Sequence, residues 1–224
     1  MIKNYVDLNQ HFSIVLCEDY YIPFIYLYNM FTALLNYLDQ QTSVPLSEED
    51  IKLIREAFIP RKFRKRQFLL QEGDVCKYIS FIVKGAVRQY TVDEKGNEHV
   101  LNLAIENWWT SDRESYHKLT PSIYNIDAWE ETQVLMLPKA DGWYDKVNTI
   151  PAFCQLRIKF DDAHHMAMQS RLHSSINYTA EYRYEELLRK YPDFLQRFPQ
   201  HIIASYLGIT KETLSRIRNQ SVKR

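Results

Sequence analysis

Hydrophobic residues recur with a helical period in the stretch "SEEDIKLIREAFIP", residues 47–60. Ile51, Ile54 and Phe58 share one face of the predicted helix. Ser47 is a suitable N-cap, and the three acidic residues after it favour the positive end of the helix dipole. Because proline cannot continue a helix, we expect the helix to end at Pro60. Residues 1–44 follow no clear period, and their role stays open.

Residues 61 to about 137 show a strand-like pattern instead. Runs rich in Val, Ile, Tyr and Phe ("KFRKRQFLL", "YISFIVKGAVRQYTV", "EHVLNLAI" and "TQVLMLP") alternate with turn signals at 72–74, Gly85 and 93–98. Short strands with regular turns predict a small antiparallel barrel or roll. The cations at 61–66 alternate with Phe63, and we interpret them as a solvated strand edge rather than a nucleic-acid patch.

After Pro151 the period becomes that of a long helix. A heptad-like seam consists of Phe153, Leu156, Phe160, Ala163, Ala167, Ser170 and Ser174. A second stripe on another face consists of Ile158, His165, Met168, Leu172 and Ile176. One face can pack on the roll and the other on a second copy of the chain, whereas the alternative is a core helix of a single chain. We expect a dimer interface that includes Phe153, Leu156, Phe160, Ala163 and Ala167.

The stretch "QHIIASYLGITKETLSRIRN", residues 200–219, fits a helix-turn-helix, and a further helix is expected over about 180–190. Gly208 falls in the turn, where a positive φ costs glycine little, and Thr210 can cap the second helix. Apolar residues then face inward. A polar set remains outside, on the part that a recognition helix inserts into the major groove: Lys211, Glu212, Thr213, Ser215, Arg216, Arg218 and Asn219. The alternative is an ordinary helical hairpin with a solvated outer face.

The chain has no net charge, because Lys+Arg and Asp+Glu both number 28, so only local concentrations of charge are informative. From 211 to 224 there are five cations and one acid, a local balance of +4 that suits phosphate binding. Lys223 and Arg224 follow the predicted helix as candidate phosphate contacts, while the few residues after Asn219 leave little room for a β-wing.

Other classes of protein find little support in the sequence. The three cysteines are far apart and no CxxC pair occurs, which argues against a disulfide framework or a cysteine-held metal. We predict no metal site, because adjacent His164 and His165 point apart on a helix. His99 and His117 are too well separated for a cupin-type centre, and no phosphate-binding loop or nucleophile elbow occurs, so we expect no enzyme. The longest apolar run near the start is too short for a membrane span and no secretory signal is evident, so the expected location is cytoplasmic.

Two of these stretches, "LLQEGDVCKYISFIVKGAVRQYTVDEKGNE" and "KETLSRIRN", resemble the Crp/Fnr family of transcription regulators over roughly residues 45–220. The resemblance implies an α+β fold: an antiparallel β-roll (a cyclic-nucleotide-binding-like jelly roll) with flanking helices, a long dimerisation helix and a C-terminal helix-turn-helix domain. It places a sensor roll at 45–148, the dimerisation helix at 149–176 and the DNA-binding domain at 177–224, after the extension 1–44. It also implies that Glu212, Ser215 and Arg216 face DNA, with Glu212 and Arg216 reading bases.

The resemblance fails where relatives that bind cyclic AMP carry a Gly-Glu pair and a later Arg-Ser or Arg-Thr. Ser111 and Asp112 stand near the first place, and Ser122 and Ile123 near the second. Because the bidentate arginine is missing, we expect no usual response to cyclic AMP, and the effector stays unknown. Arg113 or Arg88 are the candidate substitutes, and Trp108, Trp109 and Tyr124 suggest either an aromatic cavity or ordinary core.

The sequence therefore predicts a homodimeric transcription regulator that binds double-stranded DNA, with no cofactor assigned and RNA polymerase as a further candidate partner. The alternative is a ligand-sensing or protein-interaction module whose helix-turn-helix no longer binds DNA. The operator, and whether the protein activates or represses, stay open.

Overall fold

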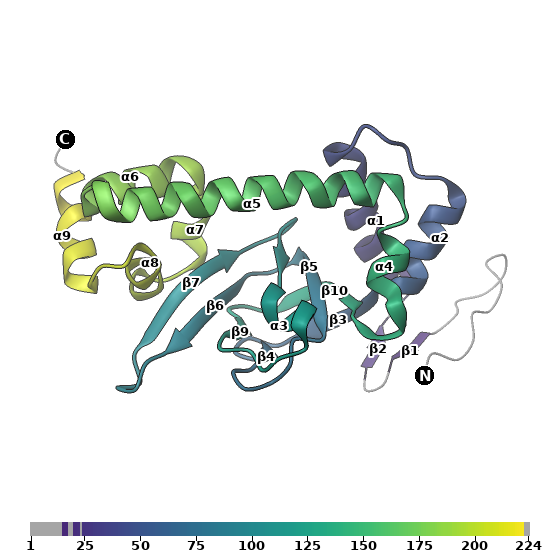
Figure 1. Ribbon diagram of the computed structural model, residues 1–224. Coiled ribbons are helices and arrows are strands. Elements are labelled where there is room, and N and C mark those ends of the chain that lie inside the picture. Colours follow the sequence, from purple (N-terminus) through teal and green to yellow (C-terminus); the bar gives the residue numbers. More distant parts are fainter. Residues whose placement is uncertain (1–14, 18–19, 23, 222–224) are drawn as a thin grey trace.

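The computed structural model describes residues 15–17, 20–22 and 24–221, and it places helices at both ends of a β-roll (Figure 1). The strands are β1 (Val15–Cys17), β2 (Tyr20–Ile22), β3 (Ile59–Phe63), β4 (Phe68–Leu70), β5 (Tyr78–Lys84), β6 (Val87–Val92), β7 (Glu98–Ala104), β8 (Trp109–Thr110), β9 (Asn125–Ala128) and β10 (Thr132–Pro138). The helices are α1 (Phe24–Gln41), α2 (Glu48–Ala57), α3 (Arg113–Lys118), the 3-10 turn η1 (Ala140–Gly142), α4 (Trp143–Val147), α5 (Pro151–Asn177), α6 (Ala180–Lys190), α7 (Pro192–Arg197), α8 (Gln200–Leu207) and α9 (Lys211–Ser221).

The roll consists of two four-stranded antiparallel sheets, with strand orders β3-β10-β5-β8 and β4-β9-β6-β7. Strands β1 and β2 form a separate antiparallel pair. The expected α+β class and antiparallel roll are therefore confirmed. Strand β3 lies at a sheet edge. The cations at 61–66 begin within β3 and continue into the turn before β4, as expected of a charged strand edge.

Gly85 forms the turn that joins β5 to β6, one strand in each sheet. Its φ is +108°, a conformation that other residues rarely adopt. A Cβ atom at this position would lie 2.6 Å from the Cα atom of Thr132 in β10, so the close approach of the turn to β10 also requires glycine. The turn signal in the sequence thus marks the point at which the chain passes from one sheet to the other.

Three groups of buried side chains hold the molecule together. One lies between the two sheets and includes Ile82, Ile126 and Val134. A second lies between the β3-β10-β5-β8 sheet and the surrounding helices α1, α2, α4 and the start of α5. Helix α1 belongs to this second group, because Leu34 and Leu38 are fully buried there. The later part of residues 1–44 therefore packs in the core, while the domain boundaries themselves stay predictions.

Helix α2 begins as predicted but ends earlier than expected. The Ser47 hydroxyl accepts a hydrogen bond from the backbone N–H of Asp50, and the Asp50 carboxylate accepts one from the N–H of Ser47. This reciprocal capping fixes the start of the helix. The helix ends at Ala57, and Pro60 lies within strand β3. The prediction that Pro60 ends the helix was wrong by three residues, because Phe58 already has extended dihedral angles and enters the core.

Helix α5 is the predicted long helix, but the first part of its apolar seam does not face solvent. Phe153 and Leu156 are each 5% exposed and pack within the same chain against the second core group. The rings of Phe153 and Phe58 are 6.1 Å apart. The interpretation of Phe153 and Leu156 as dimer-interface residues was therefore wrong, since their own chain already covers them. Phe160 is half-buried and stacks on His164, whereas Ala163 and Ala167 are exposed.

The C-terminal helices α6–α9 lie at the far end of α5 from α1 and α2 (Figure 1). The third buried group joins them to the β4-β9-β6-β7 sheet, and it combines Tyr90, Leu103 and Trp129 of the roll with Phe194 and Ile202 of the helices. No helix in the described part of the chain is long and apolar enough to cross a membrane.

Candidate nucleic-acid interface and ligand cavity

Helices α8 and α9 form the predicted helix-turn-helix. Gly208 ends α8 with a φ of +67°, and the Thr210 hydroxyl accepts a hydrogen bond from the N–H of Thr213 at 3.2 Å. Ala204, Leu214 and Ile217 are buried between the helices, each at most 3% exposed. Glycine, cap and apolar positions therefore occur where the sequence frame places them.

The outward face of α9 carries the polar residues that the sequence singled out. Thr213 is half-buried, and the rest are exposed: Lys211, Glu212, Ser215, Arg216, Arg218 and Asn219. Arg216 makes one hydrogen bond within the helix, from its guanidinium to the Thr213 hydroxyl at 3.3 Å. Glu212 and Arg216 are four residues apart and so lie on the same side of the helix. Lys223 and Arg224 lie outside the described residues.

The helix-turn-helix is docked on the roll through polar contacts as well as shared core. The Ser205 hydroxyl accepts from the N–H of Val100 at 2.9 Å and donates to the carbonyl of Glu98 at 3.0 Å. Arg197 of α7 forms ion pairs with Glu106 and Glu130 of the roll. These contacts set the position of α8, and hence of α9, relative to the sheets.

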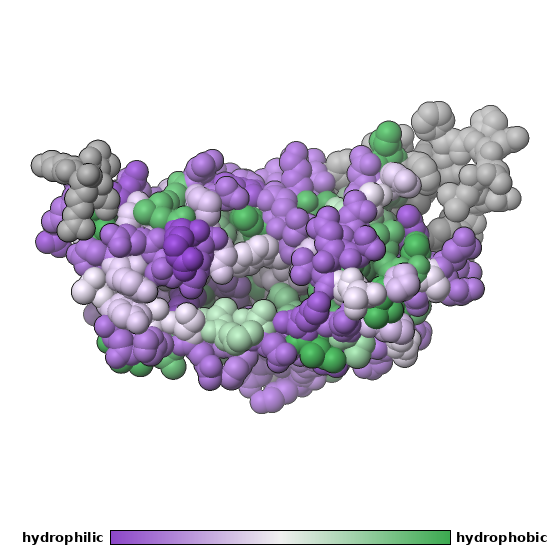
Figure 2. All heavy atoms as spheres, turned by 90° about the horizontal axis from the view of Figure 1, so that it is seen from above, coloured by the Kyte–Doolittle hydropathy of each residue, from purple (hydrophilic) through white to green (hydrophobic). Residues whose placement is uncertain are grey.

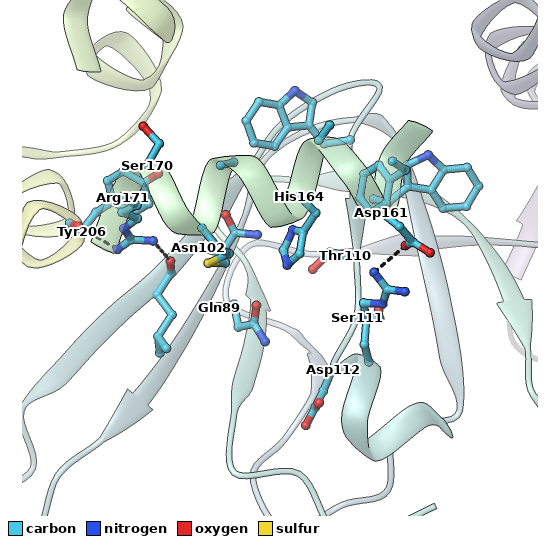
Figure 3. A pocket seen from close by; sticks show the side chains of 18 of the residues that line it. Gln89, Asn102, Thr110, Ser111, Asp112, Asp161, His164, Ser170, Arg171 and Tyr206 are labelled. Atoms are coloured by element: carbon cyan, nitrogen blue, oxygen red, sulfur yellow. Dashed lines mark hydrogen bonds and ion pairs between the residues drawn. The ribbon is translucent and has the colours of Figure 1, made fainter. Parts of the chain in front are cut away.

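A cavity of about 930 Å³ lies between the roll, α5 and the C-terminal helices. Seen from above, hydrophobic patches alternate with hydrophilic ones on this side of the molecule, and the surface is hollowed near its middle (Figure 2). The side chain of His164 lies between those of Asp161 and Arg171 and points toward Asn102 and Gln89 of the roll (Figure 3). Aromatic residues line another part of the wall, among them Trp108 and Trp109.

An ion pair crosses the cavity wall near α3. The Arg113 guanidinium lies 2.7 Å from an Asp161 carboxylate oxygen, and Arg157 lies 3.5 Å from the other oxygen. Burial, together with the nearby charge of Arg113, lowers the pKa of His164, which favours its neutral form. Burial likewise lowers the pKa of His117. At this end of the cavity both arginines are thus paired with the same carboxylate.

Most of the ligand-pocket candidates line the cavity: Trp109, Ser111, Asp112, Arg113 and Tyr124. The two cassette segments do meet, because the Ser122 hydroxyl donates to the Asp112 carboxylate at 2.7 Å. Ser122 itself is buried behind this contact and Ile123 is 63% exposed, and neither lines the cavity. The assignment of Ser122 and Ile123 to the pocket was therefore wrong.

Arg88 is also not a pocket residue, because it is buried inside the roll. Its guanidinium donates to the Asp127 carboxylate at 2.8 and 3.0 Å and to Glu98 at 3.1 Å. Burial alone would lower the pKa of Arg88, but the hydrogen bonds to Asp127 and Glu98 raise it above its ordinary value. The same contact lowers the pKa of Glu98. Arg88 is committed to these acids, so it cannot replace the missing arginine of the cassette.

Two arginines that line the cavity, Arg171 and Arg183, were not among the pocket residues predicted from the sequence. Arg171 follows Ser170 of the seam and lies on the same side of α5 as the cavity. The helical period could have placed it there, but a charge on a helix is ordinarily assigned to solvent. In the described part of the chain no group of three or more His, Cys, Asp or Glu residues could hold a metal.

Comparisons with known proteins agree with this architecture. Residues 60–142 match a family model described as the cyclic nucleotide-binding domain. No curated protein matches the chain. FixK2 from Bradyrhizobium japonicum is 17% identical, with a TM-score of 0.62 over 73% of this chain and 83% of that one. A mutant of CooA from Carboxydothermus hydrogenoformans is 19% identical, with a TM-score of 0.62 over 84% of each chain. CLP from Xanthomonas campestris, described as a c-di-GMP responsive global regulator, is 10% identical, with a TM-score of 0.61 over 79% of this chain and 92% of that one. The chain thus has a cyclic nucleotide-binding-type roll and the fold of Crp/Fnr-like transcription regulators, as the sequence resemblance implied.

Proposed function

We propose that this protein is a dimeric transcription regulator that binds double-stranded DNA through helix α9. The observation that carries the proposal is the docked helix-turn-helix, in which Leu214 and Ile217 are buried while the opposite face of α9 is polar and exposed. A helix held in this way can enter the major groove with its first turns against base edges. The proposal assigns no catalytic reaction to the chain.

Base reading falls to Glu212 and Arg216, which share one side of α9. Arg216 can form two parallel hydrogen bonds with guanine, and Glu212 can accept one from the amino group of cytosine. Lys211 and Arg218 lie toward the two ends of the exposed surface and contact phosphates. Thr213, Ser215 and Asn219 complete the contact surface.

The dimer forms along the exposed part of α5. With Phe153 and Leu156 covered by their own chain, the apolar residues left for a partner are those exposed further along the helix: Ile158, Met166, Met168, Leu172 and Ile176, from 44% to 71% exposed. Burying these side chains against a second copy removes apolar surface from water. A second copy is the occupant that fits, because a symmetric pair of α9 helices can read two half-sites.

The cavity is the place for an effector, and cyclic AMP is a poor candidate. Of the arginines proposed as substitutes, Arg88 is held by Asp127 and Glu98, and Arg113 is held by Asp161. Neither is free to form a bidentate contact with a cyclic phosphate unless an existing ion pair breaks.

Selection of bound sites from random duplex DNA tests the proposal. The expected product is a palindromic site whose half-sites lie about one helical turn apart, roughly 34 Å. The Glu212→Ala variant, selected in parallel, should relax the choice of base at one position of each half-site. If the unaltered protein enriches no sequence, the proposal fails in favour of an interaction module that no longer binds DNA.

A further inference from the structure

Two arginines from different helices meet at the C-terminal end of α8. The Arg171 guanidinium, from α5, donates to the carbonyl of Tyr206 at 2.9 Å and to the carbonyl of Leu101 in β7. The Arg183 guanidinium, from α6, donates to the carbonyl of Leu207 at 2.8 Å. Tyr206 and Leu207 are consecutive residues, so the two guanidinium groups lie beside neighbouring peptide groups. Both arginines also line the cavity, and Figure 3 shows Arg171 against Tyr206 at its edge.

These arginines differ from the other cations of the cavity wall because they have no acidic partner in the described part of the chain. Among the described residues, Arg113 and Arg157 pair with Asp161, and Lys190 pairs with Glu186. The acids of the wall are likewise engaged, each by a cation or a hydrogen-bond donor: Asp112 by Ser115 and Ser122, Glu114 by Lys118, Asp161 by Arg113 and Arg157, and Glu186 by Arg189 and Lys190. In the described residues, Arg171 and Arg183 donate to neutral carbonyl groups, and the Arg171 guanidinium also lies 4.1 Å from the centre of the Tyr206 ring, so neither contacts a negative charge.

The backbone of α8 balances only part of this charge. The C-terminus of a helix carries the equivalent of about −0.5 charge, so two guanidinium groups beside it leave roughly +1.5 uncompensated. Such a partly enclosed positive charge is costly unless an anion approaches it. The cavity is therefore electrostatically incomplete at this end.

Hydrogen-bonding capacity is also left over. A guanidinium group has five N–H donors, and Arg183 uses a single one of its nitrogens in the described structure. The Nε atom of Arg183 is buried and has no hydrogen-bond partner among the residues that the structure describes. A buried donor without a partner costs free energy, and a ligand acceptor would satisfy it. This is an observation independent of the charge balance, and it indicates the same occupant.

We propose that this end of the cavity binds the acidic group of an aromatic or otherwise apolar acid. Its carboxylate, sulfonate or phosphate lies between Arg171 and Arg183. Its apolar part lies against Leu187 of α6, against Tyr191 between α6 and α7, and against Trp108, whose ring centre is 5.3 Å from that of Tyr191. This position differs from the cassette segments at 111–112 and 122–123, which lie at the roll.

Such a ligand would contact the turn between α8 and α9 directly. Arg171 joins the end of α8, just before this turn, to the roll, so an acid that draws Arg171 away from Tyr206 or Leu101 changes how α9 is held. The effect on DNA binding rests on the function proposed above, whereas acid binding itself does not.

A pair of fluorescent probes tests acid binding. 1-Anilinonaphthalene-8-sulfonate carries a sulfonate, and N-phenyl-1-naphthylamine has the same rings without it. The full chain should bind one sulfonate probe at this site, and Arg171→Gln or Arg183→Gln should each weaken that binding about tenfold or more, because a charge-assisted contact is lost. Affinity for the neutral probe should change less than about twofold. Arg64→Gln, at an exposed residue in the turn between β3 and β4 that does not line the cavity, is the matched control and should change neither affinity.

Arg183→Lys guards against a folding defect, because it keeps the positive charge and should retain most of the affinity for the sulfonate. Equal affinity of the unaltered protein and both glutamine variants for the sulfonate probe would overturn the proposal. So would a loss of affinity for the neutral probe as large as that for the sulfonate, since the arginines would then only shape an apolar cavity. No DNA is present in this test, so failure of the acid site and failure of the proposed DNA binding are distinguishable.

Discussion

Replacing Arg216 with alanine separates the reading of bases from the folding of helix α9. The Arg216 side chain is exposed, and among the described residues its one hydrogen bond is the 3.3 Å contact with Thr213. The buried residues Leu214 and Ile217 hold the helix in place and are untouched by the change. We therefore expect the free energy of unfolding to change by less than about 0.5 kcal/mol. Any larger loss of DNA affinity then comes from the interface.

The expected loss of DNA affinity is large because a dimer loses the contact twice. A bidentate contact between arginine and guanine contributes about 1–3 kcal/mol. Two half-sites give about 2–6 kcal/mol, which is roughly 30-fold to more than 10,000-fold in the dissociation constant. Because the contact is specific to one base, binding to a scrambled duplex should weaken far less.

The assay is titration of both duplexes across a salt series, with Arg218→Ala as the matched control. Arg218 is assigned to phosphate, so its loss should weaken specific and scrambled binding alike and flatten the salt dependence by about one unit per lost contact. If Arg216→Ala lowers both affinities equally, Arg216 is a phosphate contact and the assignment of base reading is wrong.

The remaining predictions concern association, stability and ligand response. Leu172→Glu should convert the dimer to a monomer in sedimentation, because it places a charge in the proposed apolar interface; an unchanged dimer would place the interface elsewhere. In denaturant titrations, Arg88→Met should lower the free energy of unfolding by about 3–5 kcal/mol, because it leaves Asp127 buried without its partner. The double variant Arg88→Met with Asp127→Leu should recover much of this loss. Arg88 lowers the pKa of Glu98 in the folded state. This pair therefore stabilises the fold above the unfolded pKa of about 4.3, and its contribution to the free energy of unfolding is lost as the pH falls further. Glu98→Gln should show a shallower loss of stability on acidification. Calorimetry should find no binding of cyclic AMP at micromolar concentrations, whereas micromolar affinity would contradict our view that Arg113 is held by Asp161.

Local signals explain why much of the fold could be predicted. Alternating apolar residues and glycine turns identified β5, β6, β7 and β10, and the turn at Gly208 located the helix-turn-helix. These features depend on neighbouring residues, so the sequence displays them directly. Strand β9 lacked such a signal. Its residues, Asn125–Ala128, are all buried, and Asp127 is tolerated there only because Arg88, distant in sequence, pairs with it.

The helix α5 shows what periodicity does not reveal. A repeat of apolar residues indicates that one face is covered but not by what. Phe153 and Leu156 are covered by the roll and by Trp109, whose ring centre is 5.9 Å from that of Phe153, rather than by a partner. The same limit applied to the cavity: Arg171 and Arg183 are unremarkable in sequence, and only the docking of α8 brings them together.

The core shared by the roll and the C-terminal helices has a consequence for cooperativity of unfolding. Tyr90, Leu103 and Trp129 of the roll are buried by helices that include Phe194 and Ile202, so neither half completes its core alone. Heating should therefore melt the two halves in one calorimetric transition, and a roll expressed without the C-terminal helices would expose an apolar sheet face. Each 100 Å² of that face costs about 2.5 kcal/mol to hydrate. A conformational change that separated the roll from the C-terminal helices would have to bury this apolar sheet face against something else. The two halves can therefore adopt only a few discrete relative positions.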